Sequence, residues 1–179
     1  MGQDLLEGFK AFRAEAYEGE CSLMGQLVEK GQDPEYFIVS CIDSRANPGS
    51  IFKPEPGTFF AHKAMGAIVR PYKKGTALAA ALQFALTYQN VKTIIVLGHT
   101  GCGAVKALVE GLDDEEISGF VDAAQKSVRS SARTTEEQVV LHSVENLLEY
   151  PSVAKALEEE RVVIKPCLLY TSPSPRDRG

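Results

Sequence analysis

The stretch VKTIIVLGHTGCGAVKALVEG, residues 91–111, decides the fold class of this chain. Residues 91–98 form an apolar run rich in β-branched side chains, which is typical of a strand buried on both faces. A glycine-rich turn then leads directly into a helical pattern over residues 104–111, and the earlier run YFIVS, residues 36–40, has the same buried-strand character. This alternation predicts an α/β fold with a central, mainly parallel β-sheet flanked by helices.

The spacing of apolar residues predicts further helices and strands on both sides of this unit. The N-terminal helical pattern is interrupted near Gly19, and a later helix opens with Thr134 and Glu137 in the register of a capping box. The pattern over 75–89 is apolar almost all round, which predicts a helix packed between other layers. The remaining ranges expected are helices at 4–30, 114–132, 134–149 and 151–160, and strands at 58–63 and 161–165.

The composition describes an ordinary globular protein of 179 residues, with 44% hydrophobic and 24% charged residues. Lys and Arg number 19 and Asp and Glu number 24, and the resulting net charge of -5 argues against a nucleic-acid-binding surface. No apolar run reaches the ~20 residues of a membrane span, and the start MGQDLLEGFK lacks the pattern of a signal peptide. We therefore expect a cytoplasmic protein with neither a membrane nor a nucleic-acid partner.

We place a single α/β domain at residues 1–165 and treat residues 166–179 as an atypical tail. The tail sequence CLLYTSPSPRDRG is too rich in Ser, Pro and Arg to add a packed element, so it is expected to be disordered or foreign. Two of the four cysteines, Cys21 and Cys167, belong to no motif, and we expect them to have no functional role.

Two short segments carry the residues suited to chemistry: CIDSR, residues 41–45, and GHTGCG, residues 98–103. Each directly follows an expected buried strand, so parallel pairing would bring both segments to one edge of the sheet. Cys41, His99 and Cys102 would then form a Cys₂His set, the ligand count of a catalytic zinc site with an open fourth position. Two other interpretations stay open at this point. The cysteines can be small buried hydrophobes, and Gly98, Gly101 and Gly103 can cradle the phosphate of a nucleotide.

These segments, together with PGTFFAHK at residues 56–63, resemble the zinc signature of the β-class carbonic anhydrases. The resemblance runs from about Leu5 to about Ile164 and includes the stretches GQDPEYFIVSCIDSR and HSVENLLEYPSV. It implies that Cys41, His99 and Cys102 are zinc ligands, and that Asp43 and Arg45 form the catalytic pair beside the metal. Asp43 would either accept a hydrogen bond from zinc-bound water or act as a fourth ligand.

The resemblance also implies a reaction, a substrate site and a partner. The reaction is the reversible hydration of CO₂ to bicarbonate and a proton, in a homodimer or a higher homo-oligomer whose site lies between subunits. Gln32 and the pocket aromatics would then act on a neighbour's zinc, and His62 and His142 are candidate proton relays. The residues at substrate-binding positions are Gln32, Phe60, Met65, Phe84 and Gly103.

Three features depart from the family pattern. Lys63-Ala64 stands where the family has Arg-Asn, Phe84 stands where a tyrosine is common, and the usual His-Gly-Trp segment is missing. Three rival functions also remain. One is a hydrolase of carbon disulfide or carbonyl sulfide on the same scaffold, another is a non-catalytic structural or regulatory zinc protein, and the third is the nucleotide-binding module.

Overall fold

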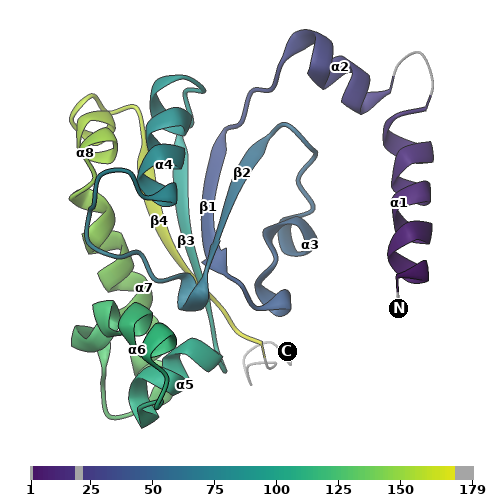
Figure 1. The fold of residues 1–179 in the computed structure, drawn as a ribbon. Helices are drawn as coiled ribbons and strands as arrows, with labels where there is room; N and C mark the ends of the chain where they lie inside the picture. The colour runs from purple at the N-terminus through teal and green to yellow at the C-terminus, as the bar shows by residue number, and fades with distance from the viewer. Residues whose placement is uncertain (1, 19–21, 172–179) are drawn as a thin grey trace, which may run out of the picture.

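The computed structural model describes residues 2–18 and 22–171, and its centre is a four-stranded β-sheet (Figure 1). The strand order is β2-β1-β3-β4, and every pairing between these strands is parallel. The prediction of a central, mainly parallel sheet is therefore confirmed. The strands are β1 (Tyr36–Cys41), β2 (Phe59–Ala64), β3 (Thr93–His99) and β4 (Val163–Leu169).

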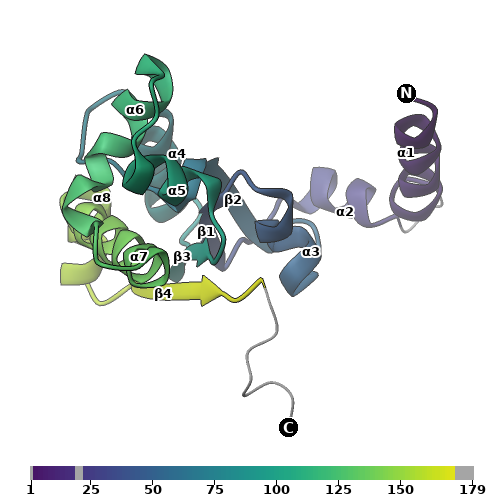
Figure 2. The same cartoon turned by 90° about the horizontal axis from the view of Figure 1, so that it is seen from below.

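Helices make the crossovers that parallel strands require. Figures 1 and 2 show α1 standing apart from the sheet, connected to it through α2. The α-helices are α1 (Gln3–Ala16), α2 (Leu23–Lys30), α3 (Pro48–Phe52), α4 (Ala77–Thr87), α5 (Gly103–Glu110), α6 (Glu115–Val121), α7 (Ala132–Leu148) and α8 (Pro151–Glu158). Short 3₁₀ helices are η1 (Ser44–Ala46), η2 (Met65–Ala67) and η3 (Asp122–Ser127).

The main hydrophobic core lies between one face of the sheet and the helices α4, α7 and α8. Alternate residues of the central strands, such as Val39 of β1 and Val96 of β3, point into it and are fully buried. Leu82 of α4 and Leu147 of α7 meet them from the helical side. Burying a side chain of this kind stabilises a fold by about 1.5–3 kcal/mol. The core therefore holds the two central strands, whose ends carry the candidate ligands, in a fixed register.

The predicted boundary of the domain at residue 165 is wrong, because β4 continues through Leu169. Its last residues pair with β3, where Gly98 faces Leu168 and His99 faces Leu169. Pro166 is compatible with this strand because β4 lies at the edge of the sheet, where prolines within strands are usually found. The rest of the predicted tail, residues 172–179, and Cys21 lie outside the described residues.

Two further expectations about helices need correction. The helix α4 buries only one face, and Phe84 and Tyr88 on its other side are 47% and 71% exposed, so within a single chain it does not pack between two layers. The helix α7 begins earlier than the predicted capping box, because the Ser131 hydroxyl accepts the Thr134 backbone N–H and caps the helix at Ala132. No helix among the described residues is long and apolar enough to span a membrane.

Candidate metal centre

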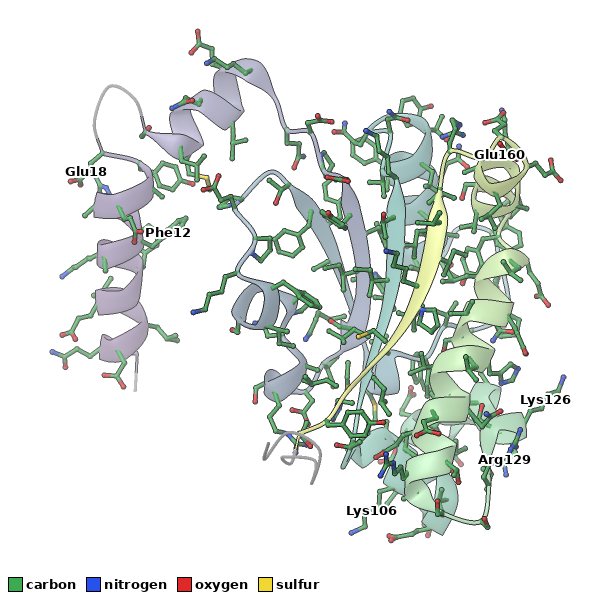
Figure 3. All side chains as sticks on the ribbon, turned by 180° about the vertical axis from the view of Figure 1, so that it is seen from behind. Phe12, Glu18, Lys106, Lys126, Arg129 and Glu160 are labelled. Atoms are coloured by element: carbon green, nitrogen blue, oxygen red, sulfur yellow. The ribbon has the colours of Figure 1, made fainter. Side chains whose placement is uncertain are left out.

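Three candidate ligands meet at the carboxyl edge of the sheet. β1 ends at Cys41 and its parallel neighbour β3 ends at His99, so both residues reach the same edge, while Cys102 follows as the N-cap of α5. All three are buried, and their ligand atoms lie within 4.8 Å of one another. In Figure 3 this is the lower edge, near the labelled Lys106 of α5, whereas Glu160 marks the opposite end. The predicted meeting of these segments is confirmed.

The spacing of the two sulfur atoms fits a tetrahedral zinc site. The Sγ atoms of Cys41 and Cys102 are 4.0 Å apart. Two sulfurs that are each about 2.3 Å from a tetrahedral zinc ion stand about 3.8 Å apart. Closing these sulfurs on an ion therefore requires a movement of only tenths of an ångström.

The His99 ring presents a free lone pair to the same point. Its Nδ1 atom lies 3.0 Å from the Thr100 carbonyl oxygen. Because a carbonyl only accepts, this contact assigns the proton to Nδ1 and leaves Nε2 as an acceptor. Nε2 is buried and has no hydrogen-bond partner among the described residues, which is unusual for a buried polar atom. A metal-binding histidine has this arrangement, with one nitrogen fixed by a carbonyl and the other free for the ion.

The two cysteines differ in how readily they ionise. The Cys41 sulfur accepts a hydrogen bond from the Cys102 thiol. It also accepts from the backbone N–H groups of Asp43 at 3.5 Å and Gly66 at 3.3 Å. These contacts lower the pKa of Cys41, although burial of the thiol acts in the opposite direction. The same contact with Cys41, together with burial, raises the pKa of Cys102. Zinc binds thiolates, so a dication is the species that would let both sulfurs ionise at once.

The turn that delivers the Gly66 N–H group depends on glycine. Gly66 has a φ of 63°, in the left-handed region that L side chains rarely adopt. A Cβ atom at this position would also lie 3.2 Å from the Cβ of Ala104 in α5. Glycine therefore allows η2 to pass close to α5 and to point its N–H at the Cys41 sulfur.

Asp43 and Arg45 form a two-pronged ion pair beside the three ligands. The Arg45 guanidinium donates to the two Asp43 carboxylate oxygens at 3.0 and 2.8 Å and to the Gly101 carbonyl at 3.1 Å. These side-chain bonds, with the Arg45 backbone N–H, hold the pKa of Asp43 well below its usual range. The carboxylate lies 3.9 Å from His99 Nε2, so an ionised hydrogen-bond acceptor lies next to the candidate ligands.

One residue at the centre was missed by sequence reasoning. Glu136 of α7 is 5% exposed, and its Oε1 atom accepts the Cys102 backbone N–H at 3.0 Å. The sequence holds no signal for it, because the segment TTEEQ reads as an ordinary polar helix start. A buried carboxylate beside the glycine-rich turn would repel a phosphate, which argues against the nucleotide-binding interpretation.

The predicted substrate-site residues divide between the two ends of the sheet. Met65 of η2 packs in the hydrophobic cluster that contains Cys41 and Cys102, and Gly103 directly follows Cys102. Phe60 and Phe84 instead line a separate cavity of about 170 Å³, with their ring centroids 6.1 Å apart.

Gln32 precedes β1 and lies at the amino end of the sheet, where it lines a cavity with residues of α2. Because β1 runs from that end to the metal centre, Gln32 and Cys41 are separated by the length of the strand. Within one chain, the structure therefore does not bring Gln32 to the candidate ligands.

The two candidate proton relays lie in unlike surroundings. His62 of β2 lines the cavity that holds Phe60 and Phe84, and burial lowers its pKa. His142 of α7 is hydrogen-bonded to Ser127 at 3.2 Å and joins α7 to η3. Next to His62, Lys63 takes the place of the family's arginine and donates to the Ala46 carbonyl of η1 at 3.1 Å.

The fold and the site together define a class: α/β proteins with a buried Cys₂His donor set at the carboxyl edge of a parallel sheet. A family model of carbonic anhydrase matches residues 36–172. The chain belongs to the carbonic anhydrase family, and its relatives place it in the beta class. The family resemblance noted in the sequence is thereby confirmed. Members of this family are carbonate dehydratases, which are lyases.

Several named proteins are similar to this chain. Beta carbonic anhydrase 5 of Arabidopsis thaliana, a chloroplastic protein, is 28% identical over 173 residues, which cover 87% of this chain and 57% of the relative. A carbonic anhydrase of Pseudomonas aeruginosa is 30% identical over 177 residues, which cover 89% of this chain and 79% of the relative. The structure of the beta-carbonic anhydrase CcaA superimposes with a TM-score of 0.83 at 25% identity, and the match covers 94% of this chain and 89% of CcaA. A tetrameric beta-carbonic anhydrase of Sordaria macrospora has a TM-score of 0.73 at 20% identity, and the match covers 93% of this chain and 87% of the Sordaria chain.

Proposed function

We propose that this chain is a zinc-dependent carbonic anhydrase that catalyses the reversible hydration of CO₂ to bicarbonate and a proton. The observation that carries the proposal is the buried set of Cys41, His99 and Cys102, with ligand atoms within 4.8 Å of one another. Two sulfurs and one imidazole favour zinc over hard cations such as Mg²⁺ and Ca²⁺. Three protein ligands leave the fourth position of a tetrahedral ion open, as in catalytic rather than structural sites.

Zinc, when bound, would supply an acidified water as the nucleophile, the chemistry best known from carbonic anhydrases with three histidine ligands. Two thiolates and a neutral imidazole offset the full charge of the ion, so we expect this centre to acidify water less than a three-histidine centre does. Activity should therefore rise from neutral to alkaline pH.

Asp43 would orient the nucleophile by accepting its hydrogen bond, and Arg45 would hold Asp43 in place. This role is supported by the two-pronged ion pair (the fork), which fixes both carboxylate oxygens and holds Oδ2 at 3.9 Å from His99 Nε2. If Asp43 became a fourth ligand, it would have to give up part of the fork. The geometry therefore favours the acceptor role over a permanently closed, non-catalytic zinc site.

The substrate pocket would be completed by a second subunit. Gln32, Phe60 and Phe84 lie away from the metal centre of their own chain, so a role for them in catalysis would require the centre of a neighbour. Phe84 and Tyr88 leave an apolar face of α4 exposed in the single chain. The Sordaria relative is tetrameric, which also supports a homodimer or a multiple of it.

The decisive experiment measures metal content and the rate of CO₂ hydration on the same purified protein, with Cys41→Ala as the control. We expect one zinc per chain and fast turnover in the wild type, with both lost in the variant. Full turnover in zinc-free protein, or one zinc per chain without turnover, would contradict the proposed function.

A further inference from the structure

Glu136 places a buried carboxylate against the backbone of a proposed zinc ligand. It is 5% exposed, and its Oε1 atom accepts the Cys102 N–H group at 3.0 Å. None of the ion pairs among the described residues involves Glu136. A buried carboxyl group needs hydrogen-bond partners, and the Cys102 N–H group is one that the structure shows.

The N-terminus of α5 does not cap itself. Cys102 is the N-cap residue, and its side chain makes no capping hydrogen bond. In a capping box, the residue three positions further on would accept the N-cap backbone N–H, but here that residue is Val105. Glu136 performs this function from α7, 34 residues along the chain. A separate helix thus fixes the backbone that carries the Cys102 sulfur.

The turn around Cys102 has little stiffness of its own. Glycine stands on both sides of the cysteine, and Gly101 has a φ of 65° in the left-handed region. Glycine leaves the backbone more conformational freedom than any other residue. A small rotation of the backbone at Cys102 would move its sulfur relative to Cys41 and His99. Two side chains constrain the turn from outside: Arg45 holds the Gly101 carbonyl, and Glu136 holds the Cys102 N–H group itself.

We propose that Glu136 is a positioning residue of the metal centre, which aligns the Cys102 sulfur with Cys41 and His99 by accepting the Cys102 backbone N–H. The proposal rests on the zinc site proposed above. In this proposal, the alignment depends on the side chain being long enough for its oxygen to reach the Cys102 N–H group. Shortening the side chain should therefore lower zinc affinity more than removing its charge does.

The test compares Glu136→Asp, which keeps the charge but withdraws the acceptor, with Glu136→Gln, which keeps the reach and an accepting oxygen. Glu145→Asp, at an exposed position on the same helix, is the matched control. Zinc affinity of the full chain is measured by competition with a chelator. Groups that orient metal ligands typically contribute about 10–100-fold to affinity. We therefore expect a loss of about tenfold or more in Glu136→Asp, a clearly smaller loss in Glu136→Gln, and wild-type affinity in the control.

Amide hydrogen exchange at residue 102 of the metal-free protein gives a second readout, and it should be faster in Glu136→Asp than in Glu136→Gln. Wild-type affinity in Glu136→Asp would overturn the proposal. Equal losses in both Glu136 variants would indicate general damage to packing, and a larger loss in Glu136→Gln would indicate an effect of charge; both count against positioning. A wild-type chain that binds no zinc would instead contradict the proposed function itself.

Discussion

Replacing Arg45 with alanine tests how the Asp43 carboxylate is controlled. The substitution removes the guanidinium contacts to Asp43 at 3.0 and 2.8 Å and the contact to the Gly101 carbonyl at 3.1 Å. Asp43 keeps its hydrogen bond from the backbone N–H of residue 45, at 2.8 Å in the wild type. The carboxylate therefore stays near the centre but loses its fixed orientation.

The size of the effect follows from what these contacts do. They orient an acceptor rather than bind zinc, so kcat/KM should fall about 10–100-fold while zinc remains bound. Arg45 also keeps the pKa of Asp43 well below its usual range, so in Arg45→Ala this pKa should rise towards the ordinary value of about 3.9. Because this value still lies well below the neutral to alkaline range in which activity is expected, Asp43 stays ionised in the variant, and the fall in rate should be similar across that range. Global stability should change little, because the Arg45 side chain is 50% exposed.

The assay is stopped-flow CO₂ hydration across pH, with zinc content measured on the same samples. Arg45→Lys keeps a positive charge without the fork, so we expect it to restore part of the rate. Arg161→Ala is the matched control, because Arg161 contacts Glu159, also two residues away, but precedes β4 at the opposite end of the sheet. If Arg45→Ala keeps its zinc and turns over at the wild-type rate, the assigned role of the pair is wrong.

Three further predictions follow from the same geometry. Wild-type activity should rise from neutral to alkaline pH at constant zinc content, and a flat profile would refute the weak acidification expected of a Cys₂His centre. Mixing inactive Gln32→Ala and Cys41→Ala subunits should restore up to about a quarter of wild-type activity, because about half of the dimers are then mixed and each mixed dimer has one intact site of two. No recovery after confirmed subunit exchange would place Gln32 outside the neighbour's site. Gly66→Ala should destabilise the fold by about 1–2 kcal/mol in urea unfolding, since an L residue is strained at a φ of 63°; an unchanged midpoint would contradict the need for glycine there.

The central strands and the meeting of the candidate ligands could be predicted because both depend on strong local patterns. The runs at 36–40 and 91–98 are apolar enough to require burial on both faces, and parallel pairing then brings Cys41 and His99 to one edge. The end of β4 could not be predicted in the same way. Its residues Pro166 and Cys167 resemble a tail in sequence, and only pairing with β3 reveals them as an edge strand.

Contacts between distant segments account for what the sequence did not reveal in the site. Glu136 looks like any polar residue at the start of a helix, and its role appears only when α7 packs against α5 and reaches the Cys102 backbone. The all-apolar pattern of α4 predicted burial on every side, whereas a single chain leaves Phe84 exposed. Periodicity identifies an apolar face, but it does not say whether the same chain or a neighbour covers that face.

X-ray absorption at the zinc edge of the purified protein tests the central claim most directly. Two thiolates and one imidazole around a single ion predict two sulfur neighbours at about 2.3 Å and a nitrogen neighbour at about 2.0–2.1 Å, with the last position held by oxygen. Loss of one sulfur neighbour in Cys41→Ser would assign that ligand. A spectrum with one sulfur or none, or with four, would contradict a centre built from Cys41, His99 and Cys102.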